Sequence, residues 1–141
     1  MKINIGKIFI SSIALFLFLF SSCREDIIPP NNPSSNLNQP VRLISSGSYT
    51  FILNADNVSS TYNDYSGLNG THSLIHLTLV DYKNGTVILH IYNNSQQLIF
   101  QKAMAIDIDE FSEYLDNETP ATFQIIFNNF SGNLKIVVDN W

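Results

Sequence analysis

The sequence is poor in cysteine, in charge and in long apolar runs. Its 141 residues hold one cysteine, Cys23, so the chain can form no disulfide within itself. Charged residues make up 13% of the chain, and the formal net charge is −5. No basic cluster is present, and an acidic chain repels phosphate backbones. We therefore expect no nucleic-acid partner.

Motifs for catalysis are also lacking. The chain has no G-x-S-x-G elbow, no H-E-x-x-H pair, no phosphate-binding glycine loop and no paired cysteines. We expect no enzymatic activity and no cofactor. Three histidines and many serines leave a hydrolase as the least favoured alternative.

The longest apolar run, from Ile8 to Phe20, is too short to span a membrane. It covers about 13 residues, interrupted by Ser11 and Ser12, whereas a spanning helix needs about 20. Lys2 and Lys7 precede it without any acidic residue. A basic start followed by a short apolar run is typical of a secretory signal peptide, which we place at residues 1–22.

The residues Phe20-Ser21-Ser22-Cys23 close this segment. They resemble the lipobox of bacterial lipoproteins, in which two small residues precede a cysteine; the family prefers leucine where this chain has Phe20. The resemblance covers about the first 26 residues. It implies cleavage before Cys23 and a diacylglycerol on its thiol, which would anchor the chain in a membrane. Several acyl chains are needed for stable attachment.

Arg24-Glu25-Asp26 follows the cysteine directly. It resembles the short charged tag that sends some Gram-negative lipoproteins to the outer face of the outer membrane. The resemblance implies an outer-membrane lipoprotein displayed at the cell surface. A periplasmic-facing anchor is the alternative, because any solvated tether can carry three charges. Without residues 1–22, five basic and twelve acidic side chains remain, a net charge of −7.

A proline-rich segment separates the cysteine from the rest of the chain. Four of the five prolines lie between Ile27 and Pro40, among asparagines and serines. This composition cannot form a packed core and favours an extended chain. We expect a disordered tether at residues 23–40 and one globular domain at residues 41–141.

The apolar residues of the domain alternate with period two, which predicts β-strands. Six strands are expected, with a seventh near 58–62 and an eighth at 41–44. Many short strands predict an antiparallel β-sandwich, either immunoglobulin-like or jelly-roll-like, with a small up-and-down barrel as the alternative. The six strands centre on 49–53, 75–79, 87–91, 98–108, 123–127 and 134–138.

Two of these strands are expected to form a hairpin. A three-residue loop, Lys83-Asn84-Gly85, places Leu77 and Leu79 opposite Ile91 and Leu89 on one core face. The opposite face would then carry His76 and His90 as diagonal neighbours. Zinc needs a third or fourth ligand, and His72 is the candidate of matching parity; a polar sheet face is the favoured interpretation.

The pattern changes between Ile108 and Pro120, where Phe111, Tyr114 and Leu115 lie at helical spacing behind Asp109. We expect a short helical turn near residues 109–115. The same stretch is acidic. Asp107, Asp109 and Glu110 are weak candidates for calcium, which binds about six to eight oxygens, but they lack the spacing of an EF-hand loop. A solvated face is the favoured interpretation.

Asn57–Gly70 is a polar segment that contains Tyr62 and Tyr65. Tyrosines among asparagines are typical of loops that bind sugars or proteins, and also of loops that anchor themselves on a core. The favoured hypothesis is a surface binding or adhesion module with a glycan or protein ligand. The alternative is an accessory subunit of an envelope complex that docks through an exposed edge strand.

Overall fold

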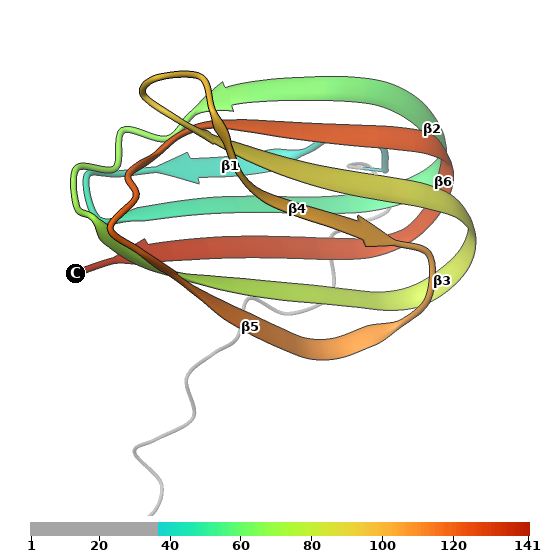
Figure 1. The fold of residues 1–141 in the computed structure, drawn as a ribbon. Coiled ribbons are helices and arrows are strands. Elements are labelled where there is room, and N and C mark those ends of the chain that lie inside the picture. The colour runs from blue at the N-terminus through green and yellow to red at the C-terminus, as the bar shows by residue number, and fades with distance from the viewer. Residues whose placement is uncertain (1–36) are drawn as a thin grey trace, which may run out of the picture. The chain divides into compact units, whose positions relative to one another are not determined.

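The computed structural model describes residues 37–141, which form six antiparallel β-strands (Figure 1). The strands are β1 (Val41–Ile44), β2 (Ser48–Tyr65), β3 (His72–Asn93), β4 (Leu98–Met104), β5 (Ile108–Asp116) and β6 (Pro120–Asn140). No helix in this part of the chain is long and apolar enough to span a membrane. The predicted signal peptide, Cys23, the charged tag and most of the tether lie outside the described residues.

The three long strands, β2, β3 and β6, each bend near the middle, so that their two halves belong to two facing sheets. In the first half of β3, residues 72–79 pair with β5, and in the second half, residues 87–92 pair with β4. β6 pairs with both halves of β3 and with both halves of β2. Sheet I therefore has the order β1, β2 (48–55), β6 (133–140), β3 (72–80), β5. Sheet II has the order β2 (60–65), β6 (120–128), β3 (86–93), β4.

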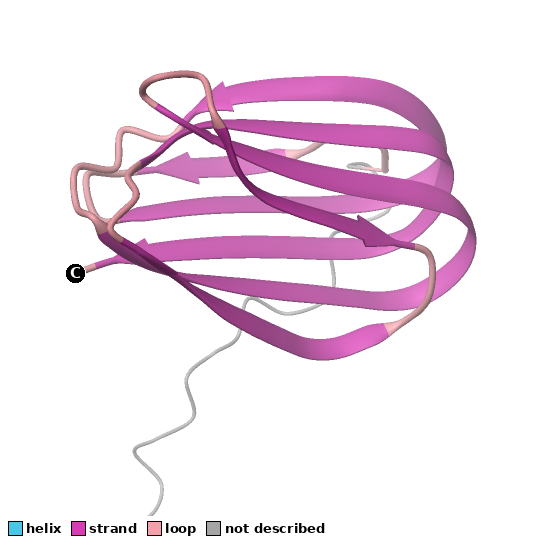
Figure 2. Cartoon of the chain, in the orientation of Figure 1, coloured by secondary structure: helices cyan, strands magenta, loops and turns pink. Residues whose placement is uncertain are grey.

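The bends lie side by side at one end of the sandwich, which we call the bend end (Figure 2). The backbone takes a left-handed φ at Asn57 (54°), Asp81 (55°) and Asn129 (46°), one non-glycine residue in each long strand. Asparagine and aspartate tolerate this conformation better than other side chains. Gly85 has a φ of 82°, and a Cβ there would overlap the carbonyl oxygen of Asn129. Glycine at this position lets β3 approach β6 closely as both strands turn.

The inward-facing residues of both sheets form one apolar core. They alternate along every long strand and are almost completely buried. Aromatic rings join the two sheets: Tyr49 of sheet I stacks on Phe123 of sheet II with ring centroids 4.0 Å apart. Phe51 contacts Tyr62 and Phe127 across the same gap. The expected β-sandwich is confirmed. The barrel alternative is wrong, because the sheet stays open between β1 and β4.

The predicted hairpin at Lys83-Asn84-Gly85 is wrong. Residues 72–93 are one bent strand, and each half pairs with β6 instead of with the other half. Leu77 and Leu89 still face the same core, but from opposite sheets. The left-handed Gly85 allows the strand to bend and does not reverse its direction. In a hairpin the two halves of β3 would pair with each other, but here both halves pair with β6.

The helical turn expected near residues 109–115 is also wrong, because this segment is strand β5 at the edge of sheet I. Phe111 and Leu115 are four residues apart, a spacing that also puts both on one face of a strand. They face inward opposite Leu77 and Ser73. The segment is a strand and not a helix because the edge of β3 offers backbone hydrogen-bond partners along nearly its whole length.

Asn38, three positions before the first strand, is tied to β2. Asn38, inside the predicted tether, donates its backbone N–H to the carbonyl of Asn54 at 2.8 Å. Its side chain donates to the carbonyl of Asp56 and accepts the N–H of Asp56. Asn38 therefore contacts the sandwich although it precedes β1.

Candidate functional site

The outer face of sheet II is a hydrogen-bonding surface without charge. Residues paired across antiparallel strands point to the same side, so the registers define rows that cross the sheet. We call these rows the tyrosine row and the amide row. The tyrosine row is Tyr65, Thr122, Tyr92 and Leu98; the amide row is Asn63, Gln124, His90 and Gln101. A third row, which is more apolar, is Thr61, Ile126, Ile88 and Ala103.

Side chains of the amide row are linked to one another across the strands. The Gln124 amide nitrogen donates to Asn63 Oδ1 at 3.1 Å. Gln124 Oε1 lies 3.2 Å from His90 Nδ1. The two bonds engage both ends of the Gln124 amide, so they fix which way the amide group points. A row held in this way presents its remaining donors and acceptors in defined positions.

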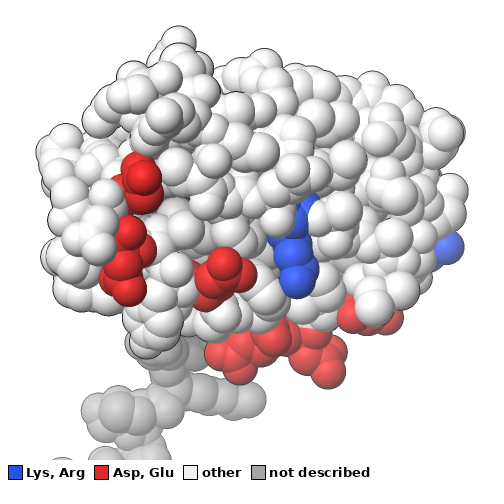
Figure 3. Space-filling view, in the orientation of Figure 1, with Lys and Arg blue, Asp and Glu red and all other residues white. Residues whose placement is uncertain are grey.

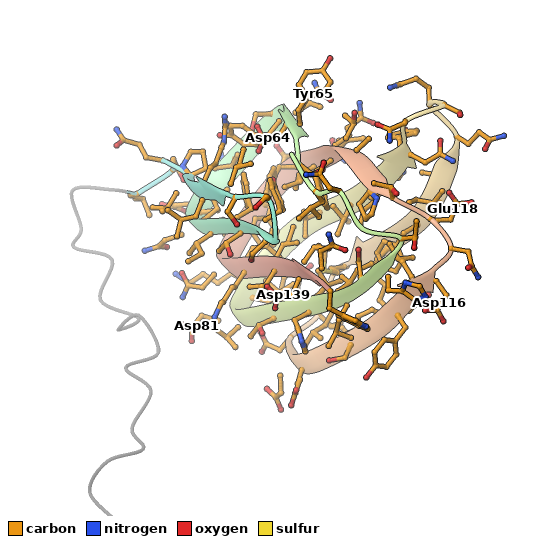
Figure 4. All side chains as sticks on the ribbon, turned by 90° about the vertical axis from the view of Figure 1, so that its left-hand side faces the viewer. Asp64, Tyr65, Asp81, Asp116, Glu118 and Asp139 are labelled. Atoms are coloured by element: carbon orange, nitrogen blue, oxygen red, sulfur yellow. The ribbon has the colours of Figure 1, made fainter. Side chains whose placement is uncertain are left out.

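Two tyrosines flank Thr122 in the neighbouring row. Tyr65 is 79% exposed, and Figure 4 shows it projecting from the end of its strand, while Asp64 turns inward. Tyr92 is half-buried, and its ring meets that of His90 edge-on, with centroids 6.1 Å apart. The Tyr92 hydroxyl also lies 3.4 Å from His90 Nδ1. Tyr92 is therefore oriented by its neighbours, and Tyr65 is exposed to solvent.

A hollow of about 490 Å³ adjoins the tyrosine row at the loop end, opposite the bend end. Its walls come from the loop after β2, the loop after β3 and the start of β6. Its polar lining consists of hydroxyl, amide and backbone groups. The lining residues are Tyr65, Ser66, Gly67, Leu68, Asn69, Asn94, Gln96, Thr119, Ala121 and Thr122.

Two buried side chains shape this hollow. Asn93 accepts hydrogen bonds from the N–H groups of Ser95 and Gln97, and donates to Glu118 at 3.0 Å. It thereby joins the loop after β3 to the loop before β6. The Ser66 hydroxyl donates to the carbonyl of Pro120 and accepts the N–H of Leu68. The walls are thus tied to the rigid sheet and to one another.

Charge is distributed unevenly over the sandwich. Within residues 37–141, the three rows of sheet II contain no Asp, Glu, Lys or Arg. Figure 3 shows acidic side chains over the left and lower parts of the view, along β5 and the loop after it, while the upper part over sheet II is uncharged. The outer face of sheet II is therefore unsuited to ionic recognition and suited to neutral hydrogen bonding.

Of the two tyrosines predicted from the sequence, Tyr65 faces outward and Tyr62 faces inward. Tyr62 packs on Phe51 and Phe127, beneath the guanidinium of Arg42. Three positions separate the tyrosines on one strand, so they must point to opposite sides. The segment 58–65 is strand and not loop, which corrects the expectation of a polar loop from Asn57 to Gly70.

The histidines do not meet as the predicted hairpin required. His76 lies on the outer face of sheet I, with Nδ1 2.9 Å from the Ser112 hydroxyl. His90 lies on the outer face of sheet II. Residues 37–141 contain no group of three or more His, Cys, Asp or Glu side chains that could hold a metal. Among the calcium candidates, Asp107 accepts the N–H of Tyr82, and Asp109 and Glu110 are exposed on β5 or beside it.

A buried polar cluster that no sequence motif indicates lies between β1 and β2. The Tyr49 hydroxyl donates to Asp64 at 2.9 Å, and Arg42 forms an ion pair with the same carboxylate at 3.2 Å. Burial and the hydrogen bond to Asp64 raise the pKa of Tyr49 above its ordinary value. Asp64 shares the inward parity of Tyr62, which is the signal that could have revealed it. The cluster closes one open side of the sandwich.

Comparison with known proteins gives no family. No family model matches the chain, and no curated protein matches its sequence. Several solved chains resemble it weakly in fold. A chain from Bacillus endospore appendages, described as a novel family of disulfide-linked pili, is 11% identical, with a TM-score of 0.44 over 70% of this chain and 88% of that one.

The second is a chain of the Glycosylation Associate Protein (Gap123) complex from Streptococcus agalactiae, which is 13% identical. Its TM-score is 0.34, over 74% of this chain and 39% of that one. The third, from a structure described as CBM4 structure and function, is 15% identical. Its TM-score is 0.32, over 74% of this chain and 76% of that one. Likeness at this level says nothing about the ligand of this chain.

Proposed function

We propose that this chain is a binding protein, not an enzyme, and that it recognises a neutral glycan on the outer face of sheet II. The observation that carries the proposal is the uncharged amide row beside the exposed ring of Tyr65, next to the hollow at the loop end.

The chemistry of the amide row matches that of a sugar. Each hydroxyl group of a sugar both donates and accepts hydrogen bonds, and so does the amide group of asparagine or glutamine. Acidic glycans and phosphates are recognised mainly by arginine and lysine, which the outer face of sheet II lacks. A neutral ligand rich in hydroxyl groups therefore fits this face best.

Tyr65 supplies the apolar part of such a site. One side of a sugar ring exposes mainly C–H groups, and an aromatic ring can cover it. Tyrosine loses little conformational entropy when it is immobilised, because it has only two side-chain torsions. An exposed tyrosine beside fixed amides therefore combines stacking with hydrogen bonding.

The test is a glycan array probed with the full chain in mild detergent, with neutral and acidic glycans side by side. We expect binding to neutral glycans, and at least tenfold weaker binding by Tyr65→Ala. The matched control is Tyr114→Ala on the outer face of sheet I, where the tyrosine is 63% exposed. It should bind like the unchanged chain.

Three results would contradict this proposal. They are silence across the array, binding to acidic glycans alone, and binding that Tyr114→Ala weakens while Tyr65→Ala does not. Equal thermal melting of both variants would show that neither substitution acts through unfolding.

The chain is proposed to be held at the bacterial outer membrane by lipid on Cys23, facing the cell exterior. The support is the sequence alone: the lipobox-like Phe20-Ser21-Ser22-Cys23 and the charged residues after it. Mass spectrometry of the chain purified from bacterial membranes should give an N-terminal Cys23 carrying acyl chains. An unmodified thiol would refute the anchor, and protection from added protease in intact cells would favour the periplasmic side.

A second candidate function, an accessory subunit of an envelope complex, is favoured by the free edge of β1. All four residues of β1 are exposed, and Leu43 and Ile44 are each at least half exposed. An open edge strand can accept a strand from a partner. A photo-crosslinking residue at Leu43 should then capture one stoichiometric partner in intact envelopes, and the same residue at exposed Gln101 should not.

A further inference from the structure

We infer that the glycan is an extended, unbranched chain of at least three sugar units that crosses the strands of sheet II over the tyrosine row. The inference rests on the proposed function and adds the length and direction of the ligand. It follows from the spacing of Tyr65, Thr122 and Tyr92.

These three residues lie in register on three adjacent strands, β2, β6 and β3. Neighbouring strands are about 4.8 Å apart, so the two tyrosines stand roughly 10 Å apart along the row. One sugar ring with its glycosidic bond spans about one strand spacing. A chain that stacks on both tyrosines must therefore place one further sugar over Thr122.

The width of the site also fits a single chain. Residues on one face of a strand repeat every second position, so the tyrosine and amide rows are about 7 Å apart. That is about the width of a sugar ring with its hydroxyl groups. Asn63, Gln124 and His90 can reach one edge of the chain, and Asn94 and Gln96 from the hollow can reach the other.

The row is open at both of its ends. It runs from β2 to β4, which are the two edge strands of sheet II. A chain lying over it can continue past either edge, so its ends need not be recognised. A branch would meet the amide row or the walls of the hollow.

The two tyrosines should contribute differently. Tyr65 is exposed next to the hollow, whereas Tyr92 is held by His90 two strands away. A single sugar can use Tyr65 and the hollow without reaching Tyr92. Only a chain of three or more units reaches both, so Tyr92 should matter for long ligands alone.

The test is calorimetric titration of the full chain, in mild detergent, with neutral unbranched oligosaccharides of one to six units. The probes are the cello-, xylo-, manno- and malto-oligosaccharides. In the series that binds, affinity should rise at least tenfold from one unit to three and then level off. Tyr92→Ala should lower affinity for three or more units about tenfold and leave single-sugar affinity unchanged. Tyr92→Phe, which keeps the ring, should retain most of the affinity.

The outcomes separate the two proposals. Equal affinity for one and six units, or binding of branched and single-sugar probes alone, would overturn the extended chain and leave a neutral-glycan site. An equal loss for all lengths in Tyr92→Ala would also overturn it. Binding of none of these sugars, together with a silent array, would overturn the proposed function itself.

Discussion

The two outer faces of the sandwich come from the same three bent strands, yet they present different chemistry. On sheet II the three rows combine amides, hydroxyls and tyrosines with the apolar Ile88 and Ile126, and they contain no Asp, Glu, Lys or Arg. On sheet I, Ile52, Leu74 and Val137 point outward, together with Lys135 and Asp139. Among the long strands, β6 thus carries outward charge only after its bend, at Lys135 and Asp139.

The inward and the outward residues of these strands are subject to different constraints. The inward residues are apolar on both halves of each strand, because both halves face one core. Packing does not determine the outward residues, so their chemistry differs freely between the halves. The hollow adjoins the outer face of sheet II, whose three rows lack Asp, Glu, Lys and Arg.

The largest effect should come from the bend that separates the two faces. Gly85→Ala puts a Cβ against the Asn129 carbonyl at a φ of 82°. We expect the free energy of unfolding to fall by about 3 kcal/mol, measured by chemical denaturation. Gly47→Ala is the control, since a Cβ there meets nothing within 4 Å. Similar costs at both positions would show that the bend does not need glycine.

The next largest effect concerns the cluster that joins the sheets beside β1. Tyr49→Phe removes the hydrogen bond to Asp64 and should lower the free energy of unfolding by about 1.5 kcal/mol at neutral pH. Because folding raises the pKa of Tyr49 above its ordinary 10, its contribution is present below pH 10 and is lost at higher pH.

The unchanged chain should therefore lose stability more steeply above pH 10 than Tyr49→Phe does. Denaturation curves at several pH values test this. Tyr114→Phe, altered at an exposed tyrosine, should follow the unchanged chain. Parallel slopes for all three proteins would contradict a role for Tyr49.

A smaller effect is expected when the charge-free face receives one charge. Gln124→Glu breaks the donor to Asn63 and places a carboxylate in the amide row. Glycan affinity should fall about tenfold, or about 1.4 kcal/mol, in the same titration. Thr78→Glu adds the same charge to sheet I opposite Lys135 and should leave affinity unchanged. Weaker binding by both variants would mean that total charge matters and the face does not.

The smallest effect should come from Asn38, which precedes β1 and lies outside both faces. Asn38→Gly keeps the left-handed backbone, φ 63°, and removes two side-chain hydrogen bonds to Asp56. We expect a cost of about 1 kcal/mol in the free energy of unfolding. Gln39→Ala, at an exposed neighbour, should change it by less than about 0.5 kcal/mol. Equal losses of unfolding free energy in the two variants would show that the hydrogen bonds of Asn38 do not stabilise the domain.

Much of the fold could be predicted because alternation is a local property. Tyr49, Phe51 and Leu53 mark one strand by themselves, and so do Val87, Leu89 and Ile91. The same parity places His90 outward, as expected. The hairpin predicted at Gly85 is wrong, because a left-handed glycine suits a hairpin turn and a bend equally well. Only the position of β6 distinguishes them.

The candidate site could be predicted only in part for the same reason. Tyr65 was singled out from a polar segment, but its neighbours Thr122 and Gln124 lie more than fifty positions later in the chain. Nothing local in the sequence indicates that Asn63, Gln124 and His90 share a row. The site is a property of register between distant strands.

The sequence by itself determined most of the strand content and the inward parity of the core. Side-chain alternation and composition act over a few residues, so they can be read without a partner. The tertiary structure alone decided that three strands bend, that residues 109–115 join an edge, and that amides and tyrosines meet on sheet II. Each of these depends on hydrogen bonds and packing between segments far apart in the chain.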